Sequence, residues 1–139
     1  MKNIISYNLF ENSESQDIRE DIDYILLDLK DLGLHYTIFG RSKFLDKPHE
    51  NWFKNTKVER GFKDYICVSV QTKKMYLDEI LNILKECINY MGNNGWKYHT
   101  KIDRGVSMVD VNLEDIPSLF EDEIVSKYLG QIHIHFWTI

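Results

Sequence analysis

The spacing of apolar residues along the chain predicts three helices. In the first, from about Gln16 to Leu32, apolar residues recur at steps of three and four and form one stripe. Gly33 follows it, as is typical of a helix C-terminus. The second predicted helix runs from about Met75 to Met91 and ends at Gly92–Gly95. The third, from about Pro117 to Leu129, begins with a proline that suits a first helical turn.

Runs rich in β-branched and aromatic residues predict six strands between these helices. They cover Asn3–Phe10, His35–Gly40, Phe62–Gln71, Trp96–Ile102, Val106–Val111 and Gln131–Thr138. Asp103–Gly105 predicts a hairpin turn. The predicted order is βαββαββαβ, and its first six elements match the split βαβ pattern of ferredoxin-like folds. We therefore expect one α+β domain over residues 1–139, with a mixed or antiparallel sheet of about six strands and three helices on one face.

Composition favours a single folded domain in a reducing compartment. The chain has 139 residues, of which 43% are hydrophobic, and this is enough for a core without metal or disulfide support. Its two cysteines, Cys67 and Cys87, fall inside apolar patterns, so we expect buried free thiols. Neither a signal-peptide pattern nor an apolar run of about 20 residues is present. These features predict a cytoplasmic protein that does not enter a membrane.

Charge is segregated along the chain, although the net charge is only −5. The segment Glu11–Asp31 holds eight acidic and two basic residues, and Asp110–Lys127 holds six acidic residues and one basic residue. Between them, Arg41–Lys74 holds nine basic and four acidic residues. Acidic helices repel nucleic-acid phosphates and attract basic proteins. We therefore expect a basic protein partner rather than a nucleic acid, although solvated helix faces often carry such charge without binding anything.

The predicted partner surface combines two acidic helices with an aromatic loop. Trp52 and Phe53 lie in the long polar segment Arg41–Arg60, and they are either core residues beneath a loop or exposed anchors for a partner. The acidic members of the surface are Asp17, Glu20, Asp21, Asp23, Asp28, Asp31, Glu121 and Asp122.

Histidines supply the only other candidate chemistry. On the last strand, His133, His135 and Trp137 alternate with apolar residues, so the two imidazoles share one face and could bind a metal together if a third ligand joined them. His35-Tyr-Thr37 resembles the His-x-Thr motif of the two-histidine phosphoesterases, in which two such motifs act as general base and acid. The second motif here would read His133-Ile-His135, with histidine where threonine is expected.

The leading hypothesis is a non-catalytic binding protein, such as a bacterial immunity protein that neutralises a basic toxin domain, often a nuclease, through its acidic face. The alternative is a small enzyme or a ligand- or metal-binding domain, phosphodiesterase-like, that uses His35 and the His133/His135/Trp137 region. A third hypothesis is a subunit that forms a homodimer through an exposed strand edge. Because nucleotide and hydrolase motifs are absent from the sequence, we expect no cofactor.

Overall fold

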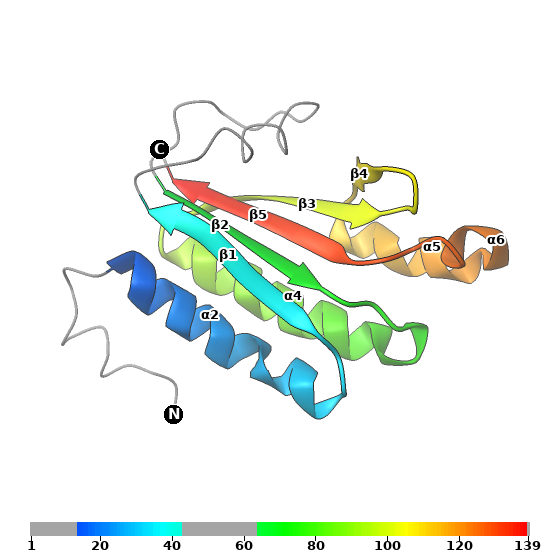
Figure 1. Cartoon of the computed structure of the whole chain (residues 1–139), viewed down its shortest axis with the longest axis horizontal. Helices are drawn as coiled ribbons and strands as arrows, with labels where there is room; N and C mark the ends of the chain where they lie inside the picture. Colours follow the sequence, from blue (N-terminus) through cyan, green and yellow to red (C-terminus); the bar gives the residue numbers. More distant parts are fainter. Residues whose placement is uncertain (1–13, 43–63, 139) are drawn as a thin grey trace.

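Five antiparallel strands form one sheet in the order β1-β2-β5-β3-β4 in the computed structural model, which describes residues 14–42 and 64–138 (Figure 1). The strands are β1 (Tyr36–Ser42), β2 (Asp64–Val70), β3 (Lys97–Asp103), β4 (Met108–Asp110) and β5 (Ile132–Thr138). The helices are α2 (Glu14–Asp31), α4 (Leu77–Asn93), α5 (Ile116–Glu121) and α6 (Glu123–Ser126). Short 3-10 turns, η2 (Lys74–Tyr76) and η3 (Leu113–Asp115), precede α4 and α5. The predicted α+β class is confirmed.

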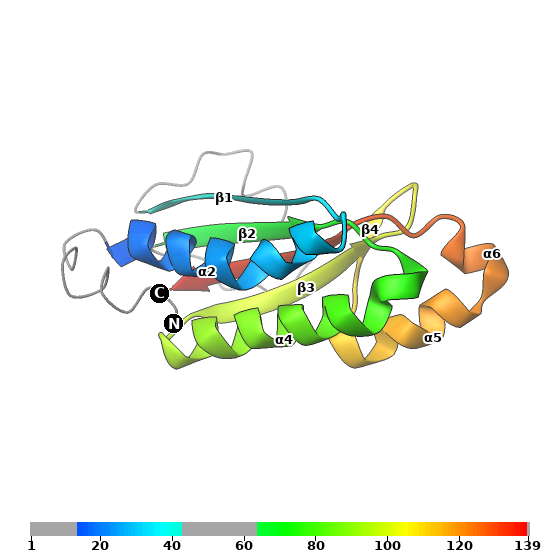
Figure 2. The ribbon, with the colours of Figure 1, turned by 90° about the horizontal axis from the view of Figure 1, so that it is seen from below.

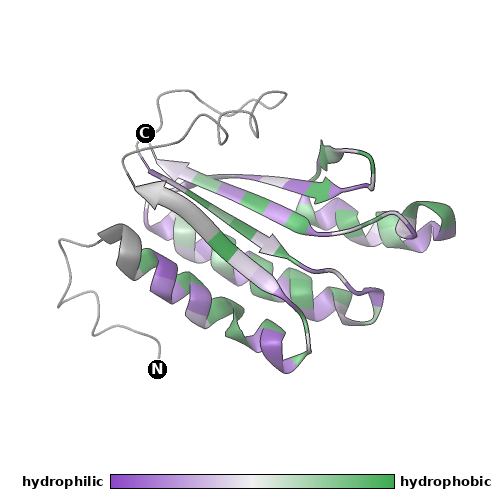
Figure 3. Cartoon of the chain, in the orientation of Figure 1, coloured by the Kyte–Doolittle hydropathy of each residue, from purple (hydrophilic) through white to green (hydrophobic). Residues whose placement is uncertain are grey.

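The two long helices lie side by side on one face of the sheet and enclose the core with it (Figure 2). Hydrophobic and hydrophilic residues alternate along both helices, as one buried face requires (Figure 3). From α2 the core receives Ile18, Ile22, Ile25, Leu26 and Leu29, and from α4 it receives Leu77, Ile80, Leu81, Leu84, Cys87 and Met91. Both cysteines are buried and free, as predicted. Among the described helices, none is long and apolar enough to cross a membrane.

Both long helices end in the same hydrogen-bonded motif. After α2, Gly33 has φ +76°, its N–H donates to the Lys30 carbonyl, and the Leu34 N–H donates to the Leu29 carbonyl. This pair of bonds is a Schellman motif, which requires a left-handed residue that glycine adopts without strain. Gly95, with φ +84°, closes α4 in the same way. The predicted stops at these glycines are confirmed.

β5 pairs with β2 on one side and with β3 on the other, so it joins the two hairpins β1–β2 and β3–β4. In a split βαβ unit this central place belongs to the first strand of the pattern. The ferredoxin-like expectation is therefore wrong about the strand order. β5 fits the central place because Ile132, Ile134 and Phe136, alternating along the strand, all join the core.

Other predicted elements differ in extent. The predicted strand Asn3–Phe10 lies outside the described residues, which leaves five strands where six were expected. The predicted strand Val106–Val111 shortens to Met108–Asp110. The predicted helix Pro117–Leu129 is interrupted at Asp122, whose φ of −81° and ψ of 113° are extended and whose carboxylate caps α6. A residue that favours N-caps thus divides one expected helix into two.

A substitution at Ile134 tests how much the core between the sheet and the helices contributes to the free energy of unfolding. Ile134 is fully buried at the centre of β5, opposite Val68 and Thr100. Ile134→Ala is expected to lower the free energy of unfolding by about 3 kcal/mol, because a buried aliphatic side chain leaves a cavity. Urea denaturation measures this loss. Ile124→Ala, in α6 where the side chain is 72% exposed, is the control and is expected to change it by less than about 0.5 kcal/mol.

Candidate functional site

The outer face of α2 presents one stripe of acidic and apolar side chains. These residues recur at helical steps of three and four, and all are exposed: Glu20, Asp23, Tyr24, Leu27, Asp28 and Asp31. Tyr24 and Leu27, which are 40% and 44% exposed, lie in the middle of the stripe with carboxylates on both sides. The stripe therefore has the composition of a docking surface with an apolar centre and a charged rim. We call it the α2 stripe.

The basic residues of α2 are directed elsewhere. The Arg19 guanidinium donates from Nη2 to the Ile38 carbonyl at 3.1 Å, and the Lys30 Nζ lies 5.4 Å from the centre of the Tyr36 ring. Within residues 18–38 and 64–138, no ion pair reaches Glu20, Asp28 or Asp31. The negative charge of the stripe is thus not neutralised by the described part of the chain.

Asp21 does not belong to this surface. It is only 3% exposed, and its Oδ2 accepts a hydrogen bond of 2.5 Å from the Tyr90 hydroxyl of α4. Its Oδ1 is buried, without a partner among the described residues. The helical spacing contained this signal, because Asp21 lies three residues after Ile18 and four before Ile25, on the apolar face. Asp21 therefore links the two long helices instead of facing a partner.

Asp23 has a structural contact as well as an exposed position. Its Oδ1 accepts a 2.6 Å hydrogen bond from the Tyr36 hydroxyl, which ties α2 to the edge strand β1. Burial raises the pKa of the Tyr36 hydroxyl above its ordinary value, and Asp23 adds to the rise. The phenol consequently remains a proton donor, and only the rest of the Asp23 carboxylate is available to a partner.

The remaining predicted surface residues lie apart from α2. Glu121 and Asp122 are exposed at the junction of α5 and α6, where Asp122 accepts hydrogen bonds from the Ile124 and Val125 amides. Figure 1 places this junction at the far end of the molecule from the start of α2. Trp52 and Phe53, as well as the Asp17 side chain, lie outside the described residues. The acidic positions thus form two separate surfaces.

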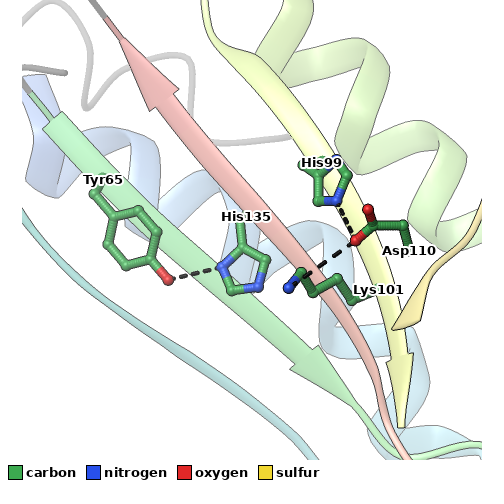
Figure 4. Close-up of polar contacts among 5 residues, drawn as sticks. All are labelled: Tyr65, His99, Lys101, Asp110 and His135. Carbon is green, nitrogen blue, oxygen red and sulfur yellow. Dashed lines mark hydrogen bonds and ion pairs between the residues drawn. The ribbon is translucent and has the colours of Figure 1, made fainter. Parts of the chain in front are cut away.

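The face of the sheet opposite the long helices carries the histidines of β5, each joined to β2. The Tyr65 hydroxyl lies 2.8 Å from Nδ1 of the buried His135, and the Ser69 hydroxyl lies 2.7 Å from Nδ1 of the half-buried His133 (Figure 4 draws the first pair). The predicted division of β5 into an apolar face and a histidine face is confirmed. Its two imidazoles, however, are directed to separate partners on β2.

These contacts test two sequence-based hypotheses for the histidines, a metal site and a phosphoesterase-like pair of motifs. No group of three His, Cys, Asp or Glu side chains that could hold a metal occurs in the part of the chain that the structure describes. His35 is exposed just before β1, and β2 lies between β1 and β5, so the structure does not set His35 opposite His133. The facing pair of motifs that the phosphoesterase resemblance implies is therefore not assembled.

Neither candidate nucleophile near these histidines is activated. Burial raises the pKa of the Cys67 thiol to about 12. Burial also raises the pKa of the Tyr65 hydroxyl, and Cys67 adds to that rise. Both groups therefore remain protonated at neutral pH, when the thiolate and phenolate would be the reactive forms. Burial lowers the pKa of His133, with Lys101 acting in the same direction and Asp103 opposing them, so its imidazole is neutral at pH 7.

A second polar group, which sequence reasoning missed, joins β3 to β4. His99 Nε2 lies 2.8 Å from Asp110 Oδ1, and Lys101 Nζ lies 4.0 Å from the same oxygen (Figure 4). Asp110 pairs directly with Lys101, so His99 reaches it from the diagonal position. The hairpin turn at Asp103–Gly105 indicated in the sequence that β3 and β4 pair. It did not indicate their register, which brings His99 and Lys101 to Asp110 and depends on where β4 begins.

Comparison of the chain with models of protein families, with curated proteins and with solved structures finds no match.

Stability is expected to decrease as the pH falls below about 6.5, because the folded state favours neutral His133. With its pKa lowered by folding, this histidine binds fewer protons than in the unfolded chain, so its contribution is complete above the unfolded pKa and is lost below it. His133→Gln should make the decrease in melting temperature from pH 7.5 to pH 5 smaller, as measured by calorimetry at about half-unit steps. His35→Gln, at an exposed histidine, is the control and should leave the decrease unchanged.

Tyr90→Phe is expected to lower the free energy of unfolding by about 2 kcal/mol, because the buried Asp21 carboxylate loses its hydrogen-bond donor. The control is Tyr128→Phe, because the Tyr128 side chain is largely exposed. It is expected to change the free energy of unfolding by less than about 0.5 kcal/mol. Urea denaturation measures both. Equal values for the two variants would show that Asp21 draws no stabilisation from Tyr90.

Proposed function

We propose that the chain is a non-catalytic binding protein that docks on a basic protein through the α2 stripe. The observation that carries the proposal is the arrangement of Glu20, Asp28 and Asp31 around Tyr24 and Leu27 on one exposed helix face. Buried aromatic side chains such as tyrosine at the centre of an interface supply much of the binding energy, whereas charges at its rim set the encounter rate and the choice of partner. The stripe provides both.

We further propose that the partner is a toxin domain with a basic, nucleic-acid-binding cleft, and that this chain is the immunity protein that neutralises it in the cytoplasm. A cleft that binds phosphates presents lysine and arginine side chains, and a row of carboxylates on a rigid helix is complementary to it. The same carboxylates repel nucleic acid. The chain would therefore compete with nucleic acid for the cleft of the toxin without itself binding nucleic acid. The exposed acids of α5 and α6, Glu121 and Asp122, would extend the attraction without sharing the contact.

The second proposal is a small phosphodiesterase-like enzyme or ligand-binding domain that uses the histidine face without the paired His-x-Thr motifs of the two-histidine phosphoesterases. It is favoured only by the presence of His99, His133 and His135 on adjacent strands of one sheet face. Turnover of a cyclic phosphodiester by the purified chain, and its loss in His133→Gln, would favour this proposal over the first.

Neutralising the stripe is expected to slow binding rather than unfold the protein. Asp28→Asn together with Asp31→Asn removes two exposed charges that make no ion pair with the described residues. With the partner captured from cells that carry the gene, the association rate constant should fall about tenfold at about 20 mM NaCl and far less at about 500 mM, where salt screens the attraction.

The matched control is Glu79→Gln together with Glu123→Gln, which changes the net charge equally at exposed positions of α4 and α6 outside the α2 stripe. We expect the rate constant of this control to remain within about twofold of the original, since steering acts near the docking face. If the α2 variant associates as fast as the original at low salt, the stripe does not steer binding and the proposal is wrong.

A further inference from the structure

A cavity of about 610 Å³ opens beside the short strand β4, at the opposite edge of the sheet from the α2 stripe. Its walls come from α4, from the first half of β3 and from residues 110–115. This volume falls in the range of pockets that hold ligands. Neither the α2 stripe nor the histidines of β5 take part in it.

The cavity adjoins the first part of β3, which pairs with β5 on one side but has no neighbouring strand on its other side among the described residues. β4 pairs only with residues 101–103 of β3, and the last bond beyond it runs from the Val111 N–H to the Thr100 carbonyl at 3.1 Å. In an antiparallel ladder, alternate residues present their N–H and C=O groups to the same side. Tyr98 therefore presents both groups on this edge. The chain turns away into η3 at Leu113, before it could pair with them.

Thr100, one of the residues that line the cavity, has a buried hydroxyl without a hydrogen-bond partner in the described part of the chain. Thr100 is 4% exposed, and its Oγ1 contacts no donor or acceptor among the described residues. Buried polar side chains almost always have a partner, and exceptions need an explanation. A ligand that enters the cavity would supply the missing bond.

Charge indicates what kind of ligand fits. Three carboxylates line the cavity, from Asp110, Glu114 and Asp115, against one ammonium from Lys85 and the imidazole that Asp110 already binds. The Tyr98 ring, 51% exposed, adds an aromatic wall that favours a cation. A lysine or arginine side chain meets these conditions.

We propose that this edge binds an extended segment of a partner protein, which adds to β3 as a strand and places a lysine or arginine side chain in the cavity. Directly opposed residues of an antiparallel pair point to the same face of the sheet. Tyr98 is paired with the core residue Phe136, so it points toward the helices, and the partner residue opposite Tyr98 directs its own side chain to that face, where the cavity lies. The backbone bonds give affinity, and the carboxylates give the preference for a basic side chain. This proposal does not depend on the α2 stripe.

The test uses the full chain, labelled with nitrogen-15, and a capped pentapeptide with arginine at its centre between two valines and two terminal threonines. Addition of this peptide should shift the amide signals of Tyr98 and Thr100, with half-saturation at about 1 mM. A peptide with glutamate at the centre should shift neither signal at about 10 mM. A peptide with an N-methylated arginine, which cannot donate to the Tyr98 carbonyl, should bind about tenfold more weakly.

Two variants separate recognition from folding. Glu114→Gln with Asp115→Asn should weaken binding of the arginine peptide about tenfold, whereas Glu79→Gln with Glu123→Gln, at exposed positions outside the cavity, should leave it unchanged. Thr100→Val keeps the shape of the side chain and removes the buried hydroxyl, so it should raise the melting temperature and weaken peptide binding. A purely structural threonine would not affect the binding.

Three results would overturn the proposal. The first is no shift of the Tyr98 amide at about 10 mM arginine peptide, and the second is an equal shift with the glutamate peptide. The third is a homodimer in sedimentation that protects the Tyr98 amide from exchange with solvent, because a second copy would then occupy the edge. Each result leaves the kinetic test of the α2 stripe unaffected.

Discussion

The structure depends on the two-sided pairing of β5. This strand makes one ladder with β2 and another with β3, and without it the hairpins β1–β2 and β3–β4 have no contact as a sheet. Its alternating sequence meets two requirements at once. Three apolar side chains complete the core beneath α2 and α4, while His133, His135 and Trp137 lie on the other face, where both imidazoles reach hydroxyls of β2. A shift of one residue in register would exchange these faces, which makes the pairing specific.

Most helices and strands could be predicted from the sequence, because each depends on residues close together along the chain. The apolar spacing of α2 and α4, and the glycines that end them, depend only on residues within a few positions along the chain. The strand order could not be read in this way. The alternation of β5 shows that one face is buried, but it does not show which strands are its neighbours. The interruption of the third helix at Asp122 also had a local signal, and the good helical pattern on both sides concealed it.

The candidate site was predictable in chemistry more than in geometry. Segregated acidic charge identified α2, yet Asp21 and Asp28 are the same residue type with opposite environments, one bonded to Tyr90 and buried, the other exposed. Helical spacing distinguishes them, and composition does not. The cavity beside β3 had no sequence signal, because it exists only where β4 stops short of Tyr98. A difference in length between two paired strands is a property of the hairpin, and neither strand alone reveals it.

The central position of β5 has a consequence for how the chain reaches its native state. Both hairpins and both long helices precede this strand in the sequence, so all of them leave the ribosome before the segment that joins them exists. Until then β2 and β3 each have one edge open to pairing with another molecule. During synthesis the chain therefore passes through a stage in which β1–β2 and β3–β4 lack the strand that pairs with both of them. Chaperones would be expected to bind such an intermediate. A chain truncated before β5 would keep the edges of β2 and β3 open and would be prone to aggregation.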